Sequence, residues 1–418
     1  MRILIVNTSE RIGGAAIAAN RLMKALRKCG VKAKMLVFDK QTTANEVIAF
    51  PKSWKHSWNF FWERFVIFFH NHLSRSHVFE VDIANVGVDI TTHPAFLAAD
   101  VIHLHWVNQG FLSLKSLQKI IATGKPIVWT MHDMWPCTGI CHHSEACDLF
   151  HTHCHNCPLL YKGAAAHDLS YQVFKKKLDI VGKSNISFVT CSHWLEQQAQ
   201  QSKLLEGKQI TAIANPIDVK LYHPMDRWKV REKYRLPQEK KLILFTSLKV
   251  TDKRKGIQYL IEACQRIVDL HPSLAKEYGV VVIGEESEWA EQQFPFPVYA
   301  IRYCKEEKEL VKLYNAVDVF VTPSLQENLP NTIMEAMACG IPCVGFNVGG
   351  ISEMIDHKEN GYVATLQSSN DLAKGIHWVL TNDHYKELSA NAVEKTHLHY
   401  NQAHIAKKYM ELYTQMMP

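Results

Sequence analysis

Two glutamates, Glu327 and Glu335, stand where carboxylates could bind a ligand that carries sugar hydroxyls. They follow an apolar run, residues 317–322, that is typical of a buried strand. Pro330 indicates the first turn of a helix, where a missing N–H costs nothing, and Gly340 indicates its end. One carboxylate would lie before the helix and reach a sugar, and the other, just over a turn inside it, would accept hydrogen bonds from a ribose diol. Taken alone, the pair would be a solvated loop charge and an ordinary helix residue.

The backbone at Asn331 and Thr332 adds an anion site, because the free N–H groups of a helix N-terminus favour a diphosphate. Lys249 and Lys255 belong to a loop with four cations that follows a second predicted strand, residues 242–247. Lysine is a compact charge that suits phosphate oxygens as a leaving group departs. A solvated basic turn is the alternative interpretation of this loop.

Gly13 and Gly14 lie between a predicted strand, residues 2–7, and a predicted helix, residues 15–28. Glycines at this point let the backbone approach a phosphate closely. The spacing differs from Gly-x-Gly-x-x-Gly, so it does not support a dinucleotide site.

Strands and helices alternate along the chain, which predicts parallel sheets covered on both faces. Two such series are separated near residues 205–225, so we expect an α/β protein of two facing, Rossmann-like, doubly wound domains with a cleft between them. The predicted domains are residues 1–210, residues 211–395 and a C-terminal helix, residues 396–418, that crosses back to the first domain. The predicted elements include strands at 101–104, 127–130, 186–191, 280–283, 298–301 and 342–346, and helices at 257–270, 306–315 and 404–417.

The composition is that of an ordinary globular protein: 418 residues, 47% hydrophobic, 21% charged, with a net charge of +6. These values exclude disorder and a coiled coil as the main architecture. The charge permits an anionic ligand but is far from the basic stripe of a nucleic-acid-binding protein. No run approaches the ~20 apolar residues that span a bilayer, and the apolar start is too short for a signal peptide. We therefore expect a cytoplasmic protein.

Together these motifs resemble the retaining, nucleotide-sugar-dependent glycosyltransferases of family 4, which have the GT-B fold. The resemblance covers nearly the whole chain and is most specific over residues 320–364. It implies that Glu327 holds the donor sugar, that Glu335 holds the ribose hydroxyls, and that Lys249 and Lys255 clamp the diphosphate. The first lysine is commonly arginine in the family, so Lys249 loses the bidentate geometry.

The same resemblance assigns Gly13 and Gly14 to the donor phosphates and His132 to the donor sugar, with Glu327, His132 and Lys255 as the catalytic group. It implies transfer of a sugar from a UDP- or GDP-sugar to a hydroxyl of a saccharide or lipid-linked acceptor in cell-surface polysaccharide synthesis. The anomeric configuration would be kept, and no cofactor would be required for the chemistry. Two alternatives stay open: a nucleotide-sugar epimerase with the same two-domain frame, and a zinc-dependent module that binds nucleic acid.

Five of the eleven cysteines fall within residues 137–157, interleaved with histidines. Thiolates at such spacing suit tetrahedral zinc, and in a cytoplasmic chain zinc is more natural than disulfides. Cys141, Cys147, Cys154 and Cys157 are the preferred ligands of a structural zinc ion, whereas Cys137 is expected to pack in the core. Disulfides and free thiols remain alternatives. The insert resembles one that follows His-Asp-Met-Trp-Pro in colanic-acid- and capsule-type bacterial transferases.

An aromatic segment, residues 54–69, has its rings at helical spacing. Such a face would dock on the inner membrane surface or on a lipid-linked acceptor. Its polar face is poor in Lys and Arg, so packing of the helix on its own sheet is the favoured interpretation. The aromatic residues are Trp54, Trp58, Phe61, Trp62, Phe65, Phe68 and Phe69.

Overall fold

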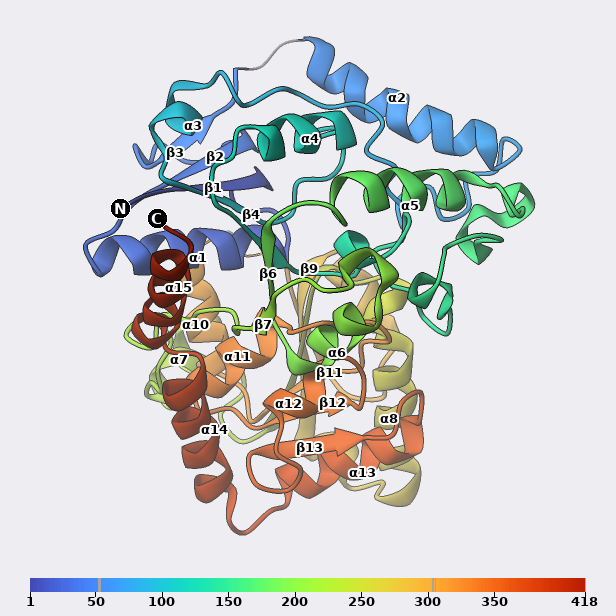
Figure 1. Cartoon of the computed structure of the whole chain (residues 1–418). Coiled ribbons are helices and arrows are strands. Elements are labelled where there is room, and N and C mark those ends of the chain that lie inside the picture. The colour runs from blue at the N-terminus through green and yellow to red at the C-terminus, as the bar shows by residue number, and fades with distance from the viewer. Residues whose placement is uncertain (52–53, 303, 305, 418) are drawn as a thin grey trace. The chain divides into compact units, whose positions relative to one another are not determined.

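The computed structural model describes residues 1–51, 54–302, 304 and 306–417. The chain forms two compact units. Unit 1 comprises Met1–Asn215 and Ala403–Pro418, and unit 2 comprises Pro216–Gln402. The boundaries drawn from the sequence lie a few residues before these. Each unit contains one parallel sheet between helices (Figure 1).

Unit 1 contains a seven-stranded sheet in the order β3-β2-β1-β4-β5-β6-β7. All printed strand pairs are parallel, and six consecutive residues of β1 are buried, as expected for a strand covered on both faces. The strands are β1 (Arg2–Ser9), β2 (Lys32–Asp39), β3 (Val47–Ala49), β4 (Val101–Leu104), β5 (Ile127–Met131), β6 (Ile186–Thr190) and β7 (Ile210–Ala212). The helices are α1 (Gly14–Lys28), α2 (Trp54–His70), α3 (Pro94–Ala98), α4 (Leu114–Ala122), α5 (Leu169–Ile180), α6 (His193–Gln201) and α15 (Gln402–Met416).

Unit 2 contains a six-stranded parallel sheet in the order β10-β9-β8-β11-β12-β13. Its strands are β8 (Lys241–Lys249), β9 (Tyr278–Glu285), β10 (Val298–Ile301), β11 (Val319–Thr322), β12 (Cys343–Phe346) and β13 (Gly361–Ala364). Its helices are α7 (Arg227–Tyr234), α8 (Ile257–Leu270), α9 (Leu274–Glu277), α10 (Glu307–Asn315), α11 (Asn331–Ala338), α12 (Ile351–Met354), α13 (Ser369–Leu380) and α14 (Tyr385–His399).

Most predicted elements agree with the structure within two residues. The predicted helix 257–270 has the bounds of α8, whereas the strand predicted at 342–346 begins at Cys343, because Pro342 has no N–H for the ladder. The predicted C-terminal segment 396–418 is not one helix. Its first residues end α14, and α15 begins at Gln402.

The C-terminal helix α15 belongs to unit 1, where it lies beside α1 (Figure 1). Ile405, Tyr409 and Tyr413 are buried in one apolar cluster with residues of α1, β1 and β2. The hydroxyl of Tyr413 lies 2.7 Å from Nδ1 of His103 on β4. The hydroxyl of Tyr409 lies 2.9 Å from Oγ1 of Thr130 on β5. The last helix of the chain therefore completes the core of the first unit.

Helix α2 turns two ionisable side chains inward. Glu63 and Arg64 are buried. Oε1 of Glu63 accepts hydrogen bonds from the backbone N–H groups of Ile83 (2.9 Å) and Ala84 (2.7 Å). Arg64 pairs with Asp82 at 3.2 Å. Burial, together with the charge of Asp82, raises the pKa of Glu63 to about 9.

Helix α2 packs on unit 1 through side chains such as buried Ile67, but five of its aromatic rings point outward, contrary to the favoured interpretation that this aromatic face is buried. Trp58, Phe61, Phe65 and Phe69 are each more than half exposed, and Trp62 is 40% exposed. Two other residues of the aromatic face expected from the sequence are Trp54, whose side chain lies outside the described residues, and Phe68, which is half-buried. We call the five exposed rings the aromatic patch. Across the described chain, no helix has the length and apolar character needed to cross a bilayer.

Replacing Tyr413 by Ala removes a fully buried ring from the contact between α15 and the sheet. We expect unit 1 to lose about 3–5 kcal/mol of unfolding free energy. Tyr413→Phe removes only the hydroxyl that meets His103 and should cost about 1 kcal/mol. Urea unfolding monitored by hydrogen exchange of unit 1 amides measures both values. Leu398→Ala, at a side chain 60% exposed, is the control, and a Tyr413→Ala loss no larger than the control would contradict the role of α15.

Candidate active site

The predicted donor-binding loops of unit 2 follow neighbouring strands. Strands β9 and β10 extend the sheet on one side of β8, and β11, β12 and β13 extend it on the other. The strand order therefore reverses between β8 and β11, and ligands of such sheets bind outside the carboxyl ends of the strands at this point. The loop with Lys255 follows β8, and the loop with Glu327 follows β11.

Lys255 and Glu327 form an ion pair between Nζ and Oε1. Both side chains remain partly open to solvent, with 34% of Lys255 and 14% of Glu327 exposed, so a ligand can reach them. The two loops approach closely at Gly256, whose φ is +68°. A Cβ there would stand 1.9 Å from the carbonyl oxygen of Pro323, so only glycine fits.

A third loop, after β12, supports the backbone of Glu327 from the other side. Gly349 has a φ of +56°, and a Cβ on it would stand 1.7 Å from the carbonyl oxygen of Glu327. The N–H of Gly350 donates to the carbonyl oxygen of Asn328 at 2.7 Å. The Gly-Gly pair of the sequence motif thus holds the acidic loop in place.

Lys249 has a different partner from Lys255. Its Nζ lies 3.0 Å from Oε1 of Glu286, and about half of each side chain is exposed. Hydrogen bonds from Thr251 and from Lys249 lower the pKa of Glu286. The structure therefore pairs Lys249 with a carboxylate after β9, and its predicted role at the diphosphate stays a prediction.

The N-terminus of α11 carries the second glutamate. Pro330 is the N-cap and its side chain accepts no capping bond, while Asn331 is buried and Thr332 is half-buried in the first turn. Glu335 is buried, and its Oε2 accepts a hydrogen bond of 2.9 Å from the hydroxyl of Tyr314. Burial and the neighbouring charge of Glu335 raise the pKa of Tyr314, so this tyrosine remains a donor.

In unit 1 the predicted residues lie at the carboxyl ends of β1 and β5. Gly13 is the N-cap of α1 with a φ of +88°, and Gly14 is its first residue. His132 follows β5; its Nε2 lies 2.9 Å from Nδ1 of His105, and its Nδ1 lies 3.4 Å from Sγ of Cys191. Burial lowers the pKa of His132 to about 4, so the ring is neutral near pH 7.

Asp133, the next residue, organises the loop after β5. Its Oδ2 accepts hydrogen bonds from Nε1 of Trp106 (2.9 Å) and lies 2.7 Å from Nδ1 of His142, and its Oδ1 accepts from the N–H of Trp135 (2.9 Å). Burial would raise the pKa of Asp133, but the charge and hydrogen bond of His142 outweigh it and lower the pKa to about 2. The carboxylate is thus ionised, and its contacts position Trp106, His142 and the backbone of Trp135.

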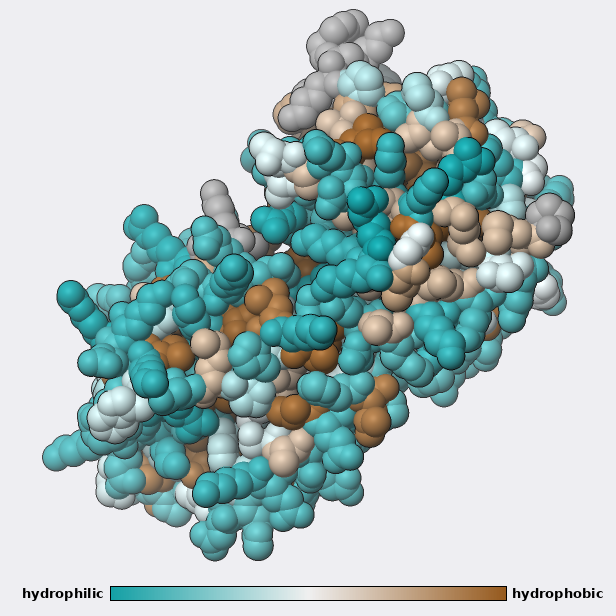
Figure 2. Space-filling model, turned by 90° about the vertical axis from the view of Figure 1, so that its left-hand side faces the viewer, coloured by the Kyte–Doolittle hydropathy of each residue, from teal (hydrophilic) through white to brown (hydrophobic). Residues whose placement is uncertain are grey.

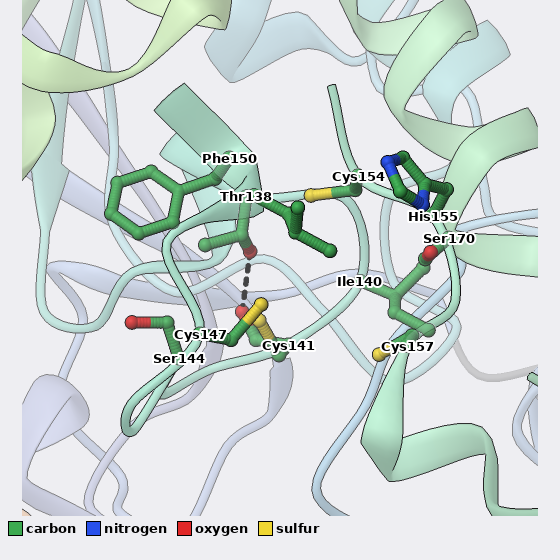
Figure 3. A pocket seen from close by; sticks show the side chains of 11 residues that line it. Thr138, Ile140, Cys141, Ser144, Cys147, Phe150, Cys154, His155, Cys157 and Ser170 are labelled. Atoms are coloured by element: carbon green, nitrogen blue, oxygen red, sulfur yellow. Dashed lines mark hydrogen bonds between the residues drawn. The ribbon is translucent and has the colours of Figure 1, made fainter. Parts of the chain in front are cut away.

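The four cysteines proposed from the sequence line one pocket, drawn in Figure 3. Cys141, Cys154 and Cys157 are buried, Cys147 is half-buried, and all are free thiols. Burial raises the pKa of Cys141 to about 11 and those of Cys154 and Cys157 to about 12. Cys137 does not line the pocket; its thiol donates to the carbonyl oxygen of Met134 at 3.1 Å. Among the described residues, no three His, Cys, Asp or Glu side chains already stand in a metal-holding arrangement.

Sequence reasoning missed the partners that hold these groups: Tyr314, Glu286, His105 and Asp133. His105 carried a usable signal, since it directly follows the strand predicted at 101–104. Tyr314 and Glu286 carried none, because each meets its partner only through the packing of separate elements.

Comparison with known proteins identifies the class. Residues 226–397 match the family described as glycosyl transferases group 1. An uncharacterized glycosyltransferase of Methanocaldococcus jannaschii is 24% identical over 361 residues, which are 80% of this chain and 89% of that protein. The Escherichia coli UDP-Gal:alpha-D-GlcNAc-diphosphoundecaprenol alpha-1,3-galactosyltransferase is 21% identical over 65% of this chain and 76% of its own length. Sucrose-phosphate synthase of Thermosynechococcus elongatus superposes with a TM-score of 0.69 at 17% identity, covering 99% of this chain and 98% of that one.

The fold class is therefore confirmed as two Rossmann-like, parallel-sheet domains of the GT-B type. The part of unit 2 that spans residues 226–397 matches the glycosyl transferases group 1 model, and the protein is a glycosyltransferase enzyme. This finding favours the transferase over the epimerase and over the zinc-dependent binding module.

The buried histidines make the stability of unit 1 dependent on pH. Burial, and then the charge of His132, lower the pKa of His103 to about 3, below its unfolded value of about 6.5. Between these values the unfolded chain binds the proton, so unit 1 is less stable at low pH and gains full stability above pH 6.5 or so. His103→Gln should shrink the difference in unfolding free energy between about pH 6.5 and 4.5 by about 2.5 kcal/mol. Urea titrations at the two pH values measure it; exposed His404→Gln is the control, and an unchanged pH slope in His103→Gln would refute the assignment.

Proposed function

We propose that this enzyme is a retaining family 4 transferase that moves a sugar from a nucleoside-diphosphate sugar to a hydroxyl of a saccharide or lipid-linked acceptor. The product would enter a cell-surface polysaccharide or glycolipid. The observation that carries the proposal is the ion pair of Lys255 and Glu327 at the switch point of the unit 2 sheet, next to the N-terminus of α11. The printed name of the Escherichia coli relative, with a UDP-sugar and a diphosphoundecaprenol acceptor, supports the donor and acceptor classes.

In this proposal Lys255 moves from Glu327 onto the diphosphate when the donor binds. The freed Glu327 carboxylate then accepts hydrogen bonds from the donor sugar, and the N–H groups around Asn331 and Thr332 face phosphate oxygens. Glu335, oriented by the Tyr314 hydroxyl, holds the ribose diol. Lysine and backbone dipoles stabilise the charge that builds on the diphosphate, so the chemistry requires no metal.

For unit 1 we propose the roles that the family resemblance assigns. The Gly13-Gly14 turn serves the donor phosphates, and His132 serves the donor sugar. Because both ring nitrogens of His132 lie near other side chains, we propose that it acts as a neutral, fixed ring rather than as a charged acid. Front-face attack keeps the anomeric configuration: the acceptor oxygen bonds to the anomeric carbon as the diphosphate leaves, and a phosphate oxygen takes the acceptor proton.

Glu327→Gln should lower kcat by about 100-fold or more, because it removes a charge that the transition state needs. Glu335→Gln should instead raise the donor KM about tenfold or more, because it weakens a buried, charge-assisted hydrogen bond. A thermal-shift screen of nucleotide sugars selects the donor, release of the nucleoside diphosphate gives the kinetics, and NMR of the product gives the anomeric configuration.

Glu359→Gln, an exposed loop carboxylate of unit 2, is the matched control and should leave both constants unchanged. Wild-type kinetics in Glu327→Gln would contradict the role of Glu327 at the donor sugar. A product with the opposite anomeric configuration from the donor would remove the retaining mechanism.

We further propose that the aromatic patch of α2 holds unit 1 on an anionic membrane surface, where a lipid-linked acceptor resides. Its helix buries Glu63 and Arg64 and exposes rings, the reverse of a soluble surface helix. Exposed Tyr161 and Lys162 lie next to the C-terminal end of α2, since a Cβ on Gly163 would meet the carbonyl oxygen of His70 at 2.1 Å. Rings flanked by a cation suit the interface of an anionic bilayer. Figure 2 shows one face of the molecule, on which hydrophobic residues form small groups among hydrophilic ones.

Phe61→Ser combined with Phe65→Ser should reduce binding to vesicles at least about tenfold, because it removes two rings from the membrane contact. Sedimentation with vesicles of phosphatidylethanolamine and phosphatidylglycerol, in about a 3:1 ratio, measures the bound fraction. The control combines Leu270→Ser with Leu398→Ser, two side chains 70% and 60% exposed elsewhere. Equal sedimentation of both variants with vesicles would contradict the membrane role. So would a concentration-dependent dimer of the wild-type chain that the Phe61→Ser and Phe65→Ser changes dissociate and the control changes do not.

A further inference from the structure

The segment between β5 and α5 has little regular structure to stabilise it. Its helical parts are three 3₁₀ turns, η1 (Trp135–Cys137), η2 (Leu149–His151) and η3 (Pro158–Gly163). A loop-rich segment of this kind commonly needs a cross-link or a metal to fix it. Its cysteines are all free thiols, so disulfides do not supply that link in this structure.

Four of these thiols surround the pocket of Figure 3, and the figure shows their sulfur atoms directed toward the space between them. They are Cys141, Cys147, Cys154 and Cys157. The rest of the lining includes apolar side chains such as Phe150. The segment thus concentrates sulfur in a site with few competing oxygen ligands, which is the donor set that zinc prefers.

Backbone N–H groups already point at two of the sulfurs. The N–H of Gly139 donates to Sγ of Cys154 at 3.3 Å, and the N–H of Leu159 donates to the thiol of Cys157. Asp168 holds the Cys157 backbone, since its Oδ2 accepts from that N–H at 2.8 Å. These contacts fix the positions of the two sulfur atoms and are of the kind that orients the thiolate ligands of a metal.

A buried lysine lies beside this segment. Lys177 is 1% exposed, and its Nζ donates to the carbonyl oxygens of Trp135 (2.6 Å) and Thr138 (3.1 Å) and lies 3.3 Å from the Trp135 ring centre. In the described part of the chain, no carboxylate forms an ion pair with it. Burial lowers the pKa of Lys177 to about 7, so the charged form of this lysine is only partly stabilised by the side chains around it. Four thiolates around one Zn²⁺ carry a net charge of −2, which would stabilise the charged form of this lysine and be half offset by it.

We propose that Cys141, Cys147, Cys154 and Cys157 bind one structural Zn²⁺ and that Lys177 is the buried counter-cation of that site. Binding forms four Zn–S bonds and releases four thiol protons to solvent, with no change of oxidation state. Because the thiols do not yet stand at metal-holding positions, they draw inward on binding, and half-buried Cys147 moves most freely. The ion fixes the segment that begins at Asp133 and leaves the sugar-transfer chemistry to other residues.

Metal analysis of the full chain, purified reduced and without chelators, tests the proposal. We expect about one zinc per chain and, with cobalt in its place, the absorption bands of a tetrahedral tetrathiolate. Each single Cys→Ser change at the four positions should lower the zinc content at least about threefold. Cys137→Ser, in the same segment but outside the pocket, should keep it.

Three results would contradict the zinc proposal. The first is a wild-type chain that takes up no zinc, and the second is a protein mass that shows disulfides among the four cysteines. The third is loss of zinc in His155→Ala while one of the Cys→Ser variants keeps its zinc. If the serine variants fail to fold, the cobalt spectrum of the wild-type chain decides alone. None of these measurements involves sugar transfer, so they stand apart from the proposed function.

The role of Lys177 has its own test. Lys177→Met keeps the length and apolar stem of the side chain, so we expect one zinc per chain but about tenfold weaker binding in chelator competition. Lys177→Arg should restore most of the affinity. Unchanged affinity in Lys177→Met would reject the counter-cation.

Discussion

The contact between Lys255 and Glu327 depends on one constraint of parallel sheets: every strand delivers its following loop to the same edge. Lys255 and Glu327 are 72 positions apart in sequence, yet their strands β8 and β11 are neighbours, so their loops must meet. Gly256 and Gly349 then decide how closely the loops approach, since a Cβ on either would collide with a backbone oxygen. Sheet order, more than any single side chain, makes this carboxylate and lysine into a candidate site.

Unit 1 applies the same constraint to a different chemistry. The ends of β4 and β5 bring together His103, His105 and His132, and the returning helix α15 closes over His103 through Tyr413. Burial keeps these rings neutral, so they act as rigid hydrogen-bonding groups and not as charges. The C-terminal residues of the chain thus help to position the histidine that the family resemblance assigns to the donor sugar.

Helix α2 and the cysteine segment show two ways of stabilising a layer outside the sheet. In α2, Glu63 and Arg64 are anchored to the segment around Asp82, which leaves the rings to solvent. In the cysteine segment, Lys177 is buried beside Trp135, with thiols nearby. Both segments bury ionisable side chains: α2 also leaves five aromatic rings exposed, and the cysteine segment places four thiols around one pocket.

The sequence alone determined the two α/β units, most strand positions, several of the helices, and the two glutamates at the helix that became α11. Apolar periodicity, Pro330 and Gly340 are local signals of a strand and of the two ends of a helix. The rules of parallel sheets then predict that the loop between them lies at the carboxyl edge of the sheet. The strands β3 and β7 escaped because three residues carry too little periodicity, and β13 escaped because its four residues begin with glycine. Only the tertiary structure decided that the rings of α2 face outward, since a helical pattern of aromatic and charged residues has the same period whichever face is buried. It also decided the partners of Lys249 and Glu335, because those contacts join elements whose packing no local pattern encodes.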